Sequence, residues 1–381
     1  MSNTLTGIIP TLYEALNVVS REMVGFIPAV RRDSNAERAA VGQTVRVPLG
    51  EAGELEDITP GAQPANSGDT TVGHADVTIT KSKAAPVRWN GEEERAVGTN
   101  GTYNQILADQ FTDAMRKLVN AVEVDLSLAA MAGASRAYGT AGTTPFGTAG
   151  DLADFAGVAQ ILDVNGAPIV DRQLVLGSMA MANLRGKQSV LFKVNEAGTN
   201  DMLRNGMTDR VQNFALRYSG GISLHTKGTG ANYVADGAHA AGIPGIVLKT
   251  GTGTVLAGDI VTFSGDANKY VVNSGITEPA KLGIGKPGLL EELATGVAMT
   301  IGANYTPNAA FSRGAIVLAA RAPAVPTGGD SADDAMTITD PVTGMTFEVR
   351  VYRQYRQVKY EVCLAWGCAA VKPEHIALLV G

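Results

Sequence analysis

The residues that most resemble a catalytic set are a serine, an aspartate and a histidine near the carboxyl end of the chain. Ser312 lies in AFSRG at 310–314, which resembles a nucleophile elbow, and Asp330 and His375 follow in the order of hydrolases. In such a site the serine attacks a carbonyl carbon while the histidine, oriented by the carboxylate, takes its proton. The elbow must turn from a strand into a helix, whereas Ser312 precedes the β-like run AIVLAARAP. We therefore expect no hydrolase site here.

Patterns that suggest phosphate or metal binding also lack the required spacing. The stretch GIGKPG at 283–288 has the Gly-Lys pair of a phosphate loop, but Pro287 stands where Ser or Thr is needed. The four histidines lie far apart, without metal-ligand spacing: His74, His225, His239 and His375. Cys363 and Cys368 are interpreted as buried thiols in a reducing compartment. The sequence thus predicts no enzyme, no cofactor and no metal.

Composition narrows the class of protein further. With 381 residues, 45% of them hydrophobic, the chain can form two or three domains with a large core. A formal net charge of −6 argues against tight nucleic-acid binding, but it does not exclude a container whose inner wall faces nucleic acid without binding it tightly. No apolar run is long enough for a bilayer and no secretory signal opens the chain, so we expect a cytoplasmic product without membrane contact.

The clearest element that could position other parts is a helix expected over Tyr103–Ala134. Its apolar side chains recur every three or four residues as one stripe: Leu107, Phe111, Met115, Leu118, Val122, Leu126 and Ala129. Polar residues fall mostly off the stripe and are expected to face water: Asp109, Asp113, Arg116, Lys117, Asn120, Glu123 and Asp125. At ~1.5 Å per residue the helix is about 45 Å long, enough for a spine that carries β-rich segments.

An arm and a long β-hairpin are expected ahead of this helix. Residues 1–43 hold one short helical pattern, and the strand patterns at 44–49 and 74–81 predict a hairpin within 44–90. The acidic tip and the basic returning side supply the candidate assembly contacts: Glu51, Glu54, Glu56, Asp57, Lys81 and Lys83. Because a two-stranded ribbon is marginally stable alone, we expect it to lie on an adjacent copy of the protein. A solvated surface loop is the alternative.

The remaining chain mixes helix and strand, which indicates an α+β fold. Residues 151–227 alternate between the two patterns around a small sheet. Residues 228–323 contain short strands between glycines, typical of a small antiparallel barrel, and 324–334 form a linker. An antiparallel pair of strands within 345–366 and a last strand at 376–380 complete the chain.

Three stretches and the order of these elements resemble a known family. The helix contains NQILADQFTDAMRKLVNAVEVDL, and the tail KYEVCLAWGCAAVKPEHIALLV has Lys372-Pro373-Glu374 where family members often have a basic residue, Pro and Glu. LAGDIVTFSG at 256–265 is similar to a Gly-Asp strand start of inserted domains. The chain thus resembles the major capsid (coat) proteins of tailed bacteriophages with the Hong Kong 97 fold, in the short-tailed subgroup with an inserted β-barrel.

The resemblance implies an α+β capsid fold with a spine helix, an extended loop and an inserted domain. Its parts in chain order would be an arm 1–43, the extended loop 44–90, a peripheral domain 91–150 with the spine 103–134, an axial domain 151–227, an inserted barrel 228–323, an axial return 324–344, and peripheral strands with the final strand 345–381.

In function, the resemblance implies a structural subunit that assembles as hexamers and pentamers into an icosahedral shell around double-stranded DNA in the host bacterial cytoplasm. Partners would be other copies, a portal, the packaged DNA at the inner face, and a separate scaffolding protein, since only about 43 residues precede the first strand. One alternative is the shell of a bacterial encapsulin-type nanocompartment. Another is a modular β-rich surface-binding protein, disfavoured by an aromatic content of 6%.

Overall fold

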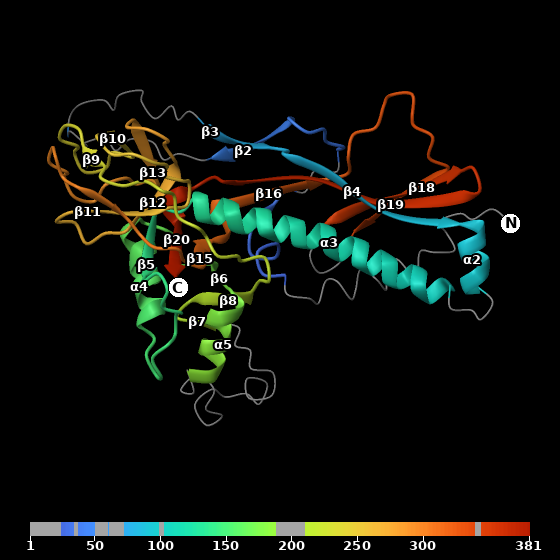
Figure 1. The fold of residues 1–381 in the computed structure, drawn as a ribbon, viewed down its shortest axis with the longest axis horizontal. Helices are drawn as coiled ribbons and strands as arrows, with labels where there is room; N and C mark the ends of the chain where they lie inside the picture. Colours follow the sequence, from blue (N-terminus) through green and yellow to red (C-terminus); the bar gives the residue numbers. More distant parts are fainter. Residues whose placement is uncertain are drawn as a thin grey trace.

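The computed structural model describes residues 24–33, 37–49, 60, 72–98, 103–187, 210–339 and 344–381. A few helices and many strands make up this part of the chain, so the expected α+β class is confirmed. The described strands form sheets of six, twelve and two strands. Figure 1 shows the long helix α3 running beside the six-stranded sheet, with the short strands β9 to β13 gathered near one end of α3.

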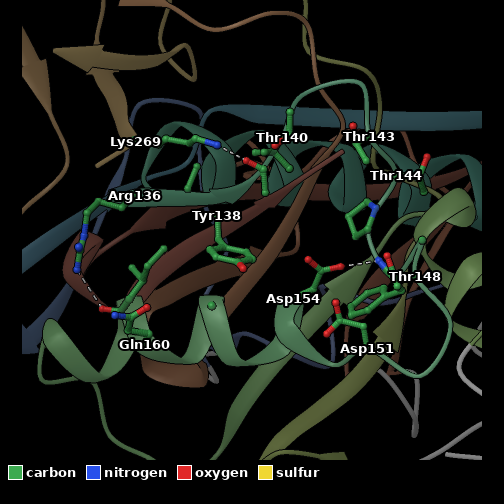
Figure 2. A pocket seen from close by; sticks show the side chains of 18 of the residues that line it. Arg136, Tyr138, Thr140, Thr143, Thr144, Thr148, Asp151, Asp154, Gln160 and Lys269 are labelled. Atoms are coloured by element: carbon green, nitrogen blue, oxygen red, sulfur yellow. Dashed lines mark hydrogen bonds between the residues drawn. The ribbon is translucent and has the colours of Figure 1, made fainter. Parts of the chain in front are cut away.

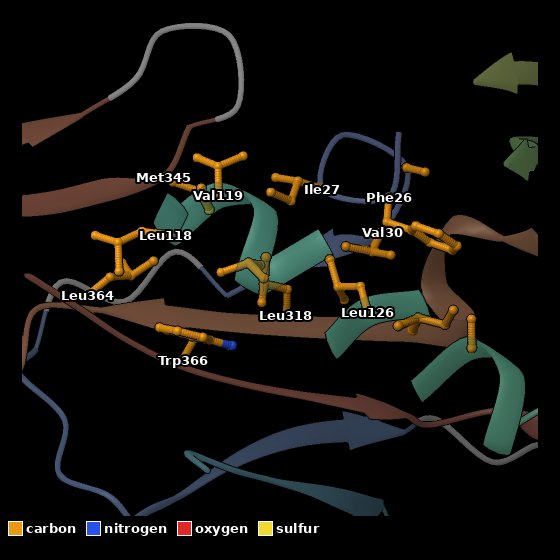
Figure 3. Close-up of a cluster of buried hydrophobic side chains, with 14 of the residues drawn as sticks. Phe26, Ile27, Val30, Leu118, Val119, Leu126, Leu318, Met345, Leu364 and Trp366 are labelled. Atoms are coloured by element: carbon orange, nitrogen blue, oxygen red, sulfur yellow. The ribbon is translucent and has the colours of Figure 1, made fainter. Parts of the chain in front are cut away.

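Helix α3, Tyr103–Ala132, is the helix expected over 103–134. Its apolar stripe is buried, and Phe111, Met115 and Val122 are wholly inaccessible. Figure 3 shows Leu118 and Leu126 of this stripe in the main hydrophobic core. Gly133 follows the last residue of the helix and lies against the end of β19, where a Cβ at this position would collide with the side chain of Ala370.

The six-stranded sheet beside α3 is built on β19, Gln357–Ala370. Strands β4 and β18 pair with the same part of β19 and therefore lie along its opposite edges, while β16 pairs with its last residues. Side chains alternate between the faces: Ile316 and Leu318 join the core with α3, and Val317 and Ala319 face away from it. The other strands of this sheet are β1 Arg31–Arg32, β4 Lys81–Asn90, β16 Ile316–Arg321, β17 Asp334–Thr339 and β18 Thr346–Gln354.

The predicted hairpin forms from β2, Thr44–Leu49, and β3, Gly73–Thr78, which are antiparallel. Its inward side chains, such as Val47 and Val77, pack on Val317, Ala319 and Ala365 of the six-stranded sheet. The expectation that the ribbon lies on another copy is therefore wrong for this described base. Its apolar face finds a surface within the same chain, because β16 and β19 present small apolar side chains on the face opposite α3.

Three predicted boundaries are corrected by the strand pairings. Lys81 to Asn90 do not belong to the hairpin, since β4 pairs along its whole length with β19. The predicted insertion 228–323 is too long, because β15 and β16 pair with β20 and β19 outside it. The predicted axial return 324–344 contains β17, which instead pairs with β18 of the peripheral strands. The boundaries were wrong because the partners of these strands depend on tertiary contacts, which local patterns do not show.

A second group of strands packs against two helices below the first sheet. Its core contains Phe155 and Leu162 of α4, Leu174 and Leu176 of β6, and Phe214 of β8. The final strand β20 lies between β15 and β5, in the same sheet as β6 and β8. The elements are β5 Arg136–Gly139, α4 Ala153–Val164, β6 Arg172–Leu176, α5 Ser178–Lys187, β7 Arg210–Val211, β8 Phe214–Tyr218, β15 Pro307–Ser312, a 3-10 turn Arg313–Ala315, a second one at Pro373–His375, and β20 Ile376–Val380.

Short antiparallel strands between residues 229 and 306 surround a core of their own, which includes Tyr233, Phe263 and Tyr270. They pair in the order β14-β11-β12-β13-β10-β9. Val234 of β9 also bridges to Ala298 beside β14, so the pairings run round in a ring. The strands are β9 Val234–Ala235, β10 Gly245–Lys249, β11 Ile260–Phe263, β12 Tyr270–Ser274, β13 Lys281–Ile284 and β14 Met299–Ile301.

Replacing Phe111 with Ala tests how far the fold depends on α3. The Phe111 ring is fully buried and meets the ring of Tyr360 edge-on, with centroids 5.4 Å apart. We expect Phe111→Ala to lower the free energy of unfolding by ~3–5 kcal/mol, measured by urea denaturation. Leu128→Ala, on the exposed face of α3, is the control and should cost less than about 1 kcal/mol. Equal losses for the two variants would contradict this packing.

Candidate assembly surfaces

The predicted acidic contacts Glu51, Glu54, Glu56 and Asp57 lie outside the described residues. The strands that carry this segment are described as far as the pair Leu49 and Gly73. Residues 50–71 contain five acidic residues and neither Lys nor Arg. The segment that leaves the end of the hairpin is therefore strongly negative.

Lys81, one of the two predicted basic contacts, holds three elements together. Its Nζ lies 2.6 Å from Oδ1 of Asp125 on α3, and Trp366 Nε1 donates to the other carboxylate oxygen at 2.8 Å. Asp125 is thus half-buried between β4 and β19, not on a water-facing side of the helix as its spacing predicted. Lys81 and Asp125 stabilise the contact of α3 with the sheet.

Lys83, the other predicted basic contact, is exposed at the free edge of the sheet. Its ammonium group lies over the Trp366 ring, 6.0 Å from the centroid. Among the described strands, β4 pairs only with β19, so the outer edge of β4 faces a groove. Pro86 in this edge has no N–H to offer to an added strand, and with Lys83 it protects the edge from strand addition.

A groove of about 500 Å³ separates this edge of β4 from α3. Lys83, Arg88 and Lys117 contribute positive charge to its lining. The one lining carboxylate, Asp113, pairs with Arg116 one helical turn away, at 2.5 Å. The groove is therefore cationic. The sequence predicted Lys83 on the returning side of the hairpin, but it could not join Lys117 to it, because that requires knowing how α3 packs on β4.

The hairpin leads away from this groove in its own chain. Strand β3 continues into β4 along β19, because Thr80 N donates to Trp366 O and Lys81 pairs with Trp366. Ten residues separate Gly73 from Lys83, roughly 33 Å of extended strand. Figure 1 shows β3 and β4 following one another along the length of the sheet. The described end of the hairpin at Leu49 and Gly73 therefore lies far from the groove along the strand direction.

Glu123 on α3 was expected to face water, but only 1% of its surface is exposed. Its Oε1 accepts from Ile27 N at 2.7 Å, and Oε2 accepts from Phe26 N at 3.0 Å and Gly25 N at 3.2 Å. Ser219 Oγ donates to Oε2 at 2.6 Å. Three successive backbone N–H groups make a nest for this carboxylate, which joins the amino-terminal arm, α3 and the end of β8. The helical period alone gave no signal for a partner so distant in sequence.

Burial raises the pKa of the Glu123 carboxyl above its ordinary value, while the hydrogen bonds from Ser219, Ile27, Phe26 and Gly25 lower it. The loss of hydration raises the pKa by more than the four hydrogen-bond donors lower it. This carboxyl is therefore easier to protonate in the folded chain than in the unfolded chain.

The hollow between α4 and the Gly/Thr-rich residues 139–150 has a volume of about 570 Å³ (Figure 2). Its charged groups contact the chain itself: Asp154 accepts from Phe146 N at 2.6 Å, and Lys269 donates to Gly139 O. The Arg136 guanidinium donates to the side-chain oxygens of Asn165 and Asn268. This arrangement braces the loop against α4.

The structure brings two members of the hydrolase-like set together. Ser312 Oγ lies 3.4 Å from His375 Nδ1, but Asp330 instead accepts bonds from Arg350 and Tyr352 on the other sheet. Among the residues that the structure describes, no carboxylate is hydrogen-bonded to His375 as a triad requires, and Ser312 ends a strand that leads into a 3-10 turn. Across the residues that the structure describes, no three His, Cys, Asp or Glu side chains form a metal-binding group.

Cys363 and Cys368 are free thiols, the first buried and the second half-buried. Burial raises the pKa of both thiols to about 12, so thiolate is scarce at neutral pH. No helix within the described part of the chain has the length and apolar character to cross a bilayer.

No family model and no curated protein matches this chain. Solved structures resemble it over about nine-tenths of its length. A structure described as Mycobacterium phage Che8 is 11% identical, with 90% of this chain and 88% of that chain covered, at a TM-score of 0.46. The capsid of cyanophage P-SCSP1u is 11% identical over 92% and 86%, at 0.47. The mature capsid of bacteriophage PhiM1 is 9% identical over 93% and 86%, at 0.44.

Replacing Glu123 with Gln removes the negative charge and places an NH₂ group among N–H donors. We expect a loss of about 1.5–3 kcal/mol in the free energy of unfolding at neutral pH, measured by urea denaturation, because backbone N–H groups lose their acceptor. Ser219→Ala, which removes one of the donors, should cost only ~1 kcal/mol. A Glu123→Gln protein as stable as wild type would show that this nest does not hold the arm.

The pH dependence of that loss follows from the raised pKa of Glu123. A carboxyl with a raised folded pKa adds stability that is complete below its ordinary value of 4.5 and is lost as pH rises through the folded pKa. The difference in unfolding free energy between wild type and Glu123→Gln should therefore be largest in acid and shrink as pH rises. Urea titrations at a series of pH values measure it. A difference that grows with pH would mean that the pKa is lowered.

Proposed function

We propose that this chain is the major capsid protein of a tailed bacteriophage, a structural subunit that assembles into an icosahedral shell around double-stranded DNA. The supporting observation is a pair of oppositely charged features: an acidic sequence between the two strands of the hairpin, and a cationic groove between β4 and α3. Each copy carries both, and the acidic segment is residues 50–71. Opposite charges on separate parts of one chain favour association between copies.

The hairpin base makes this contact possible. Because Val45, Val47 and Val77 pack on the six-stranded sheet, the fold holds the two strands that flank the acidic segment. The proposed contacts are those named above, with Glu51, Glu54, Glu56 and Asp57 of one copy directed to Lys81, Lys83 and the groove of the next. Lys83 is the better candidate of the two lysines, since Lys81 already pairs with Asp125.

Such contacts are weak one by one. Exposed ion pairs contribute only about 0–1 kcal/mol each, so they set orientation more than strength. In a head-to-tail arrangement every copy both gives and receives a segment, and a closed assembly holds each copy through several partners at once. Effective concentration then turns modest contacts into a stable shell.

In this proposal the fold is of the Hong Kong 97 type. Helix α3 is the spine, the hairpin with residues 50–72 is the extended loop, the sheet of β4, β18 and β19 is the peripheral domain, and the ring of short strands between 229 and 306 is the inserted barrel. The hexamers and pentamers would be directed by a separate scaffolding protein and a portal in the host bacterial cytoplasm. The packaged DNA would meet the inner face without tight binding, as suits a chain of net charge −6.

Deleting residues 51–69 tests the proposed shell. The variant should remain a folded, soluble monomer, because the packed base of the hairpin lies outside the deletion, but it should not close shells. Negative-stain microscopy and sizing of the variant and wild type measure this, with urea denaturation as the folding control. Normal particles from the deletion variant would refute the role of the segment.

Charge reversal locates the receiving surface more finely. Lys83→Glu, Arg88→Glu and Lys117→Glu together should abolish assembly, and adding Glu51→Lys, Glu54→Lys and Glu56→Lys in the same chain should restore it. The matched control reverses three exposed lysines on the ring of short strands and its approach, Lys227, Lys281 and Lys286, with the same change in net charge. If this control abolishes assembly as the groove reversal does and the swapped charges fail to rescue it, the groove is not the receiving surface.

A further inference from the structure

The outer face of α3 changes from polar to apolar toward the carboxyl end of the helix. Lys117 and Asn120 are exposed on this face, whereas Val124 and Leu128 continue it over the next two turns. These two aliphatic side chains are 39% and 47% exposed, although the helix buries its opposite side in the main core. The last turns of α3 therefore offer an apolar surface to solvent.

The chain segment that follows β8 lies along these turns. A Cβ at Gly221 would lie 3.0 Å from Val124 N, so the segment touches the helix there. Four residues later, His225 Nε2 lies 2.9 Å from Asp259 Oδ1. A Cβ on the glycine that precedes Asp259 would lie 2.7 Å from Met131 Cε. The segment therefore follows α3 for about two turns, from Val124 toward Met131.

Two exposed leucines border this path. Leu224 directly precedes the histidine, and Leu256 N donates to the same carboxylate at 2.8 Å. Both side chains are exposed to solvent. With the two residues of the helix they form a surface that we call the apolar patch: Val124, Leu128, Leu224 and Leu256. Exposed apolar side chains that gather in one place, unlike scattered ones, mark a binding surface.

The amino-terminal arm enters the described structure beside the apolar patch. Val24 is the first described residue, and Gly25 N donates to Oε2 of Glu123, the neighbour of Val124 in α3. The arm cannot swing away at this point, because the nest around Glu123 holds its next residues. Residues 10–23 are therefore tethered close to the patch.

The sequence of residues 10–23 carries a matching apolar stripe. At helical spacing its large apolar side chains fall on one side: Leu12, Leu16, Val19 and Met23. Polar side chains fall on the opposite side: Glu14, Asn17 and Arg21. Fourteen residues would make a helix about 21 Å long, enough to cover the last turns of α3. A helix of this length is marginal alone in water, so its stripe needs an apolar surface to lie on.

We propose that residues 10–23 dock as an amphipathic helix on the apolar patch of their own chain, with the apolar stripe against the patch. The occupant is the arm of the same chain because its tether at Val24 is short. A short tether gives the arm an effective concentration that a free second copy does not reach in dilute solution. Docking covers a surface that would otherwise promote unspecific association. The contact is separate from the acidic segment and the cationic groove, and it does not require a shell.

Trypsin measures the docking, because Arg21 is the only Lys or Arg ahead of Arg31. A protease cuts the undocked arm, so the rate of cleavage after Arg21 reports how much of the arm is undocked. Leu16→Asp, on the apolar stripe, should speed this cleavage at least ~10-fold, as loss of a buried leucine contact implies. Asn17→Asp brings the same charge to the polar side and should be cleaved at the wild-type rate. Equal rates for the two variants would overturn the docked arm.

The patch is tested from the other side of the contact. Leu224→Asp should speed the same cleavage as Leu16→Asp does, and Val170→Asp, at a side chain 80% exposed elsewhere, is the control and should not. Urea midpoints for chain unfolding check that the variants are folded. Leu128→Ala keeps the patch apolar, so its small cost in chain unfolding agrees with docking. A Leu224→Asp protein that is cleaved at the wild-type rate would overturn the patch as the receptor.

Cross-linking shows which copy supplies the arm. In the full-length chain at low protein concentration, Leu224→Cys is combined in turn with each stripe variant: Leu12→Cys, Leu16→Cys, Val19→Cys and Met23→Cys. A disulfide within one chain is expected from at least one of these pairs and from none of the matched polar-side variants: Glu14→Cys, Asn17→Cys and Arg21→Cys. Disulfides between two chains, or no disulfide from any stripe variant, would overturn docking on the same chain. Either result leaves the proposed function intact, because that function depends on residues 51–69 and the groove.

Discussion

The whole structure depends on burying one face of α3. The apolar stripe of this helix contacts β19, β4 and β16 of the six-stranded sheet, and its far end reaches β12 and β15. Fully burying an aliphatic or aromatic side chain contributes about 1.5–3 kcal/mol, so this stripe is a large share of a net stability of roughly 5–15 kcal/mol. Helix α3 therefore packs on both sheets and helps to fix their relative positions.

Around that rod, polar contacts decide where the extended parts begin. Glu123 holds the arm at Gly25 to Ile27, and Asp125 holds Lys81 and Trp366. On the far face of the sheet, small apolar side chains such as Val317 and Ala319 receive the base of the hairpin. The arm and the hairpin thus leave the body from defined points.

The local pattern of the sequence was sufficient to predict helices and strands. It was insufficient to predict which of them pack or pair with one another. The period of 3.6 predicted α3 within two residues, and alternation predicted the strands of the hairpin, the tail pair and the last strand. The same period predicted that Glu123 faces water, which is wrong. Its partners are three backbone N–H groups about 97 residues away in the chain, and the residues near Glu123 in the sequence do not indicate them. Three other features also depend on contacts between segments that are distant in sequence. They are the pairing of β16 with β19, the pairing of β17 with β18, and the cationic groove. Ser312 and His375 resemble half of a triad only because two strand ends meet.

The most direct measurement of the central claim, that copies of this chain complete one another, is negative-stain microscopy of the purified full chain, expressed with and without its neighbouring genes. The account predicts closed, uniform particles in at least one of these preparations. Single, separate chains in all of them, with residues 50–71 folded onto their own body, would contradict it.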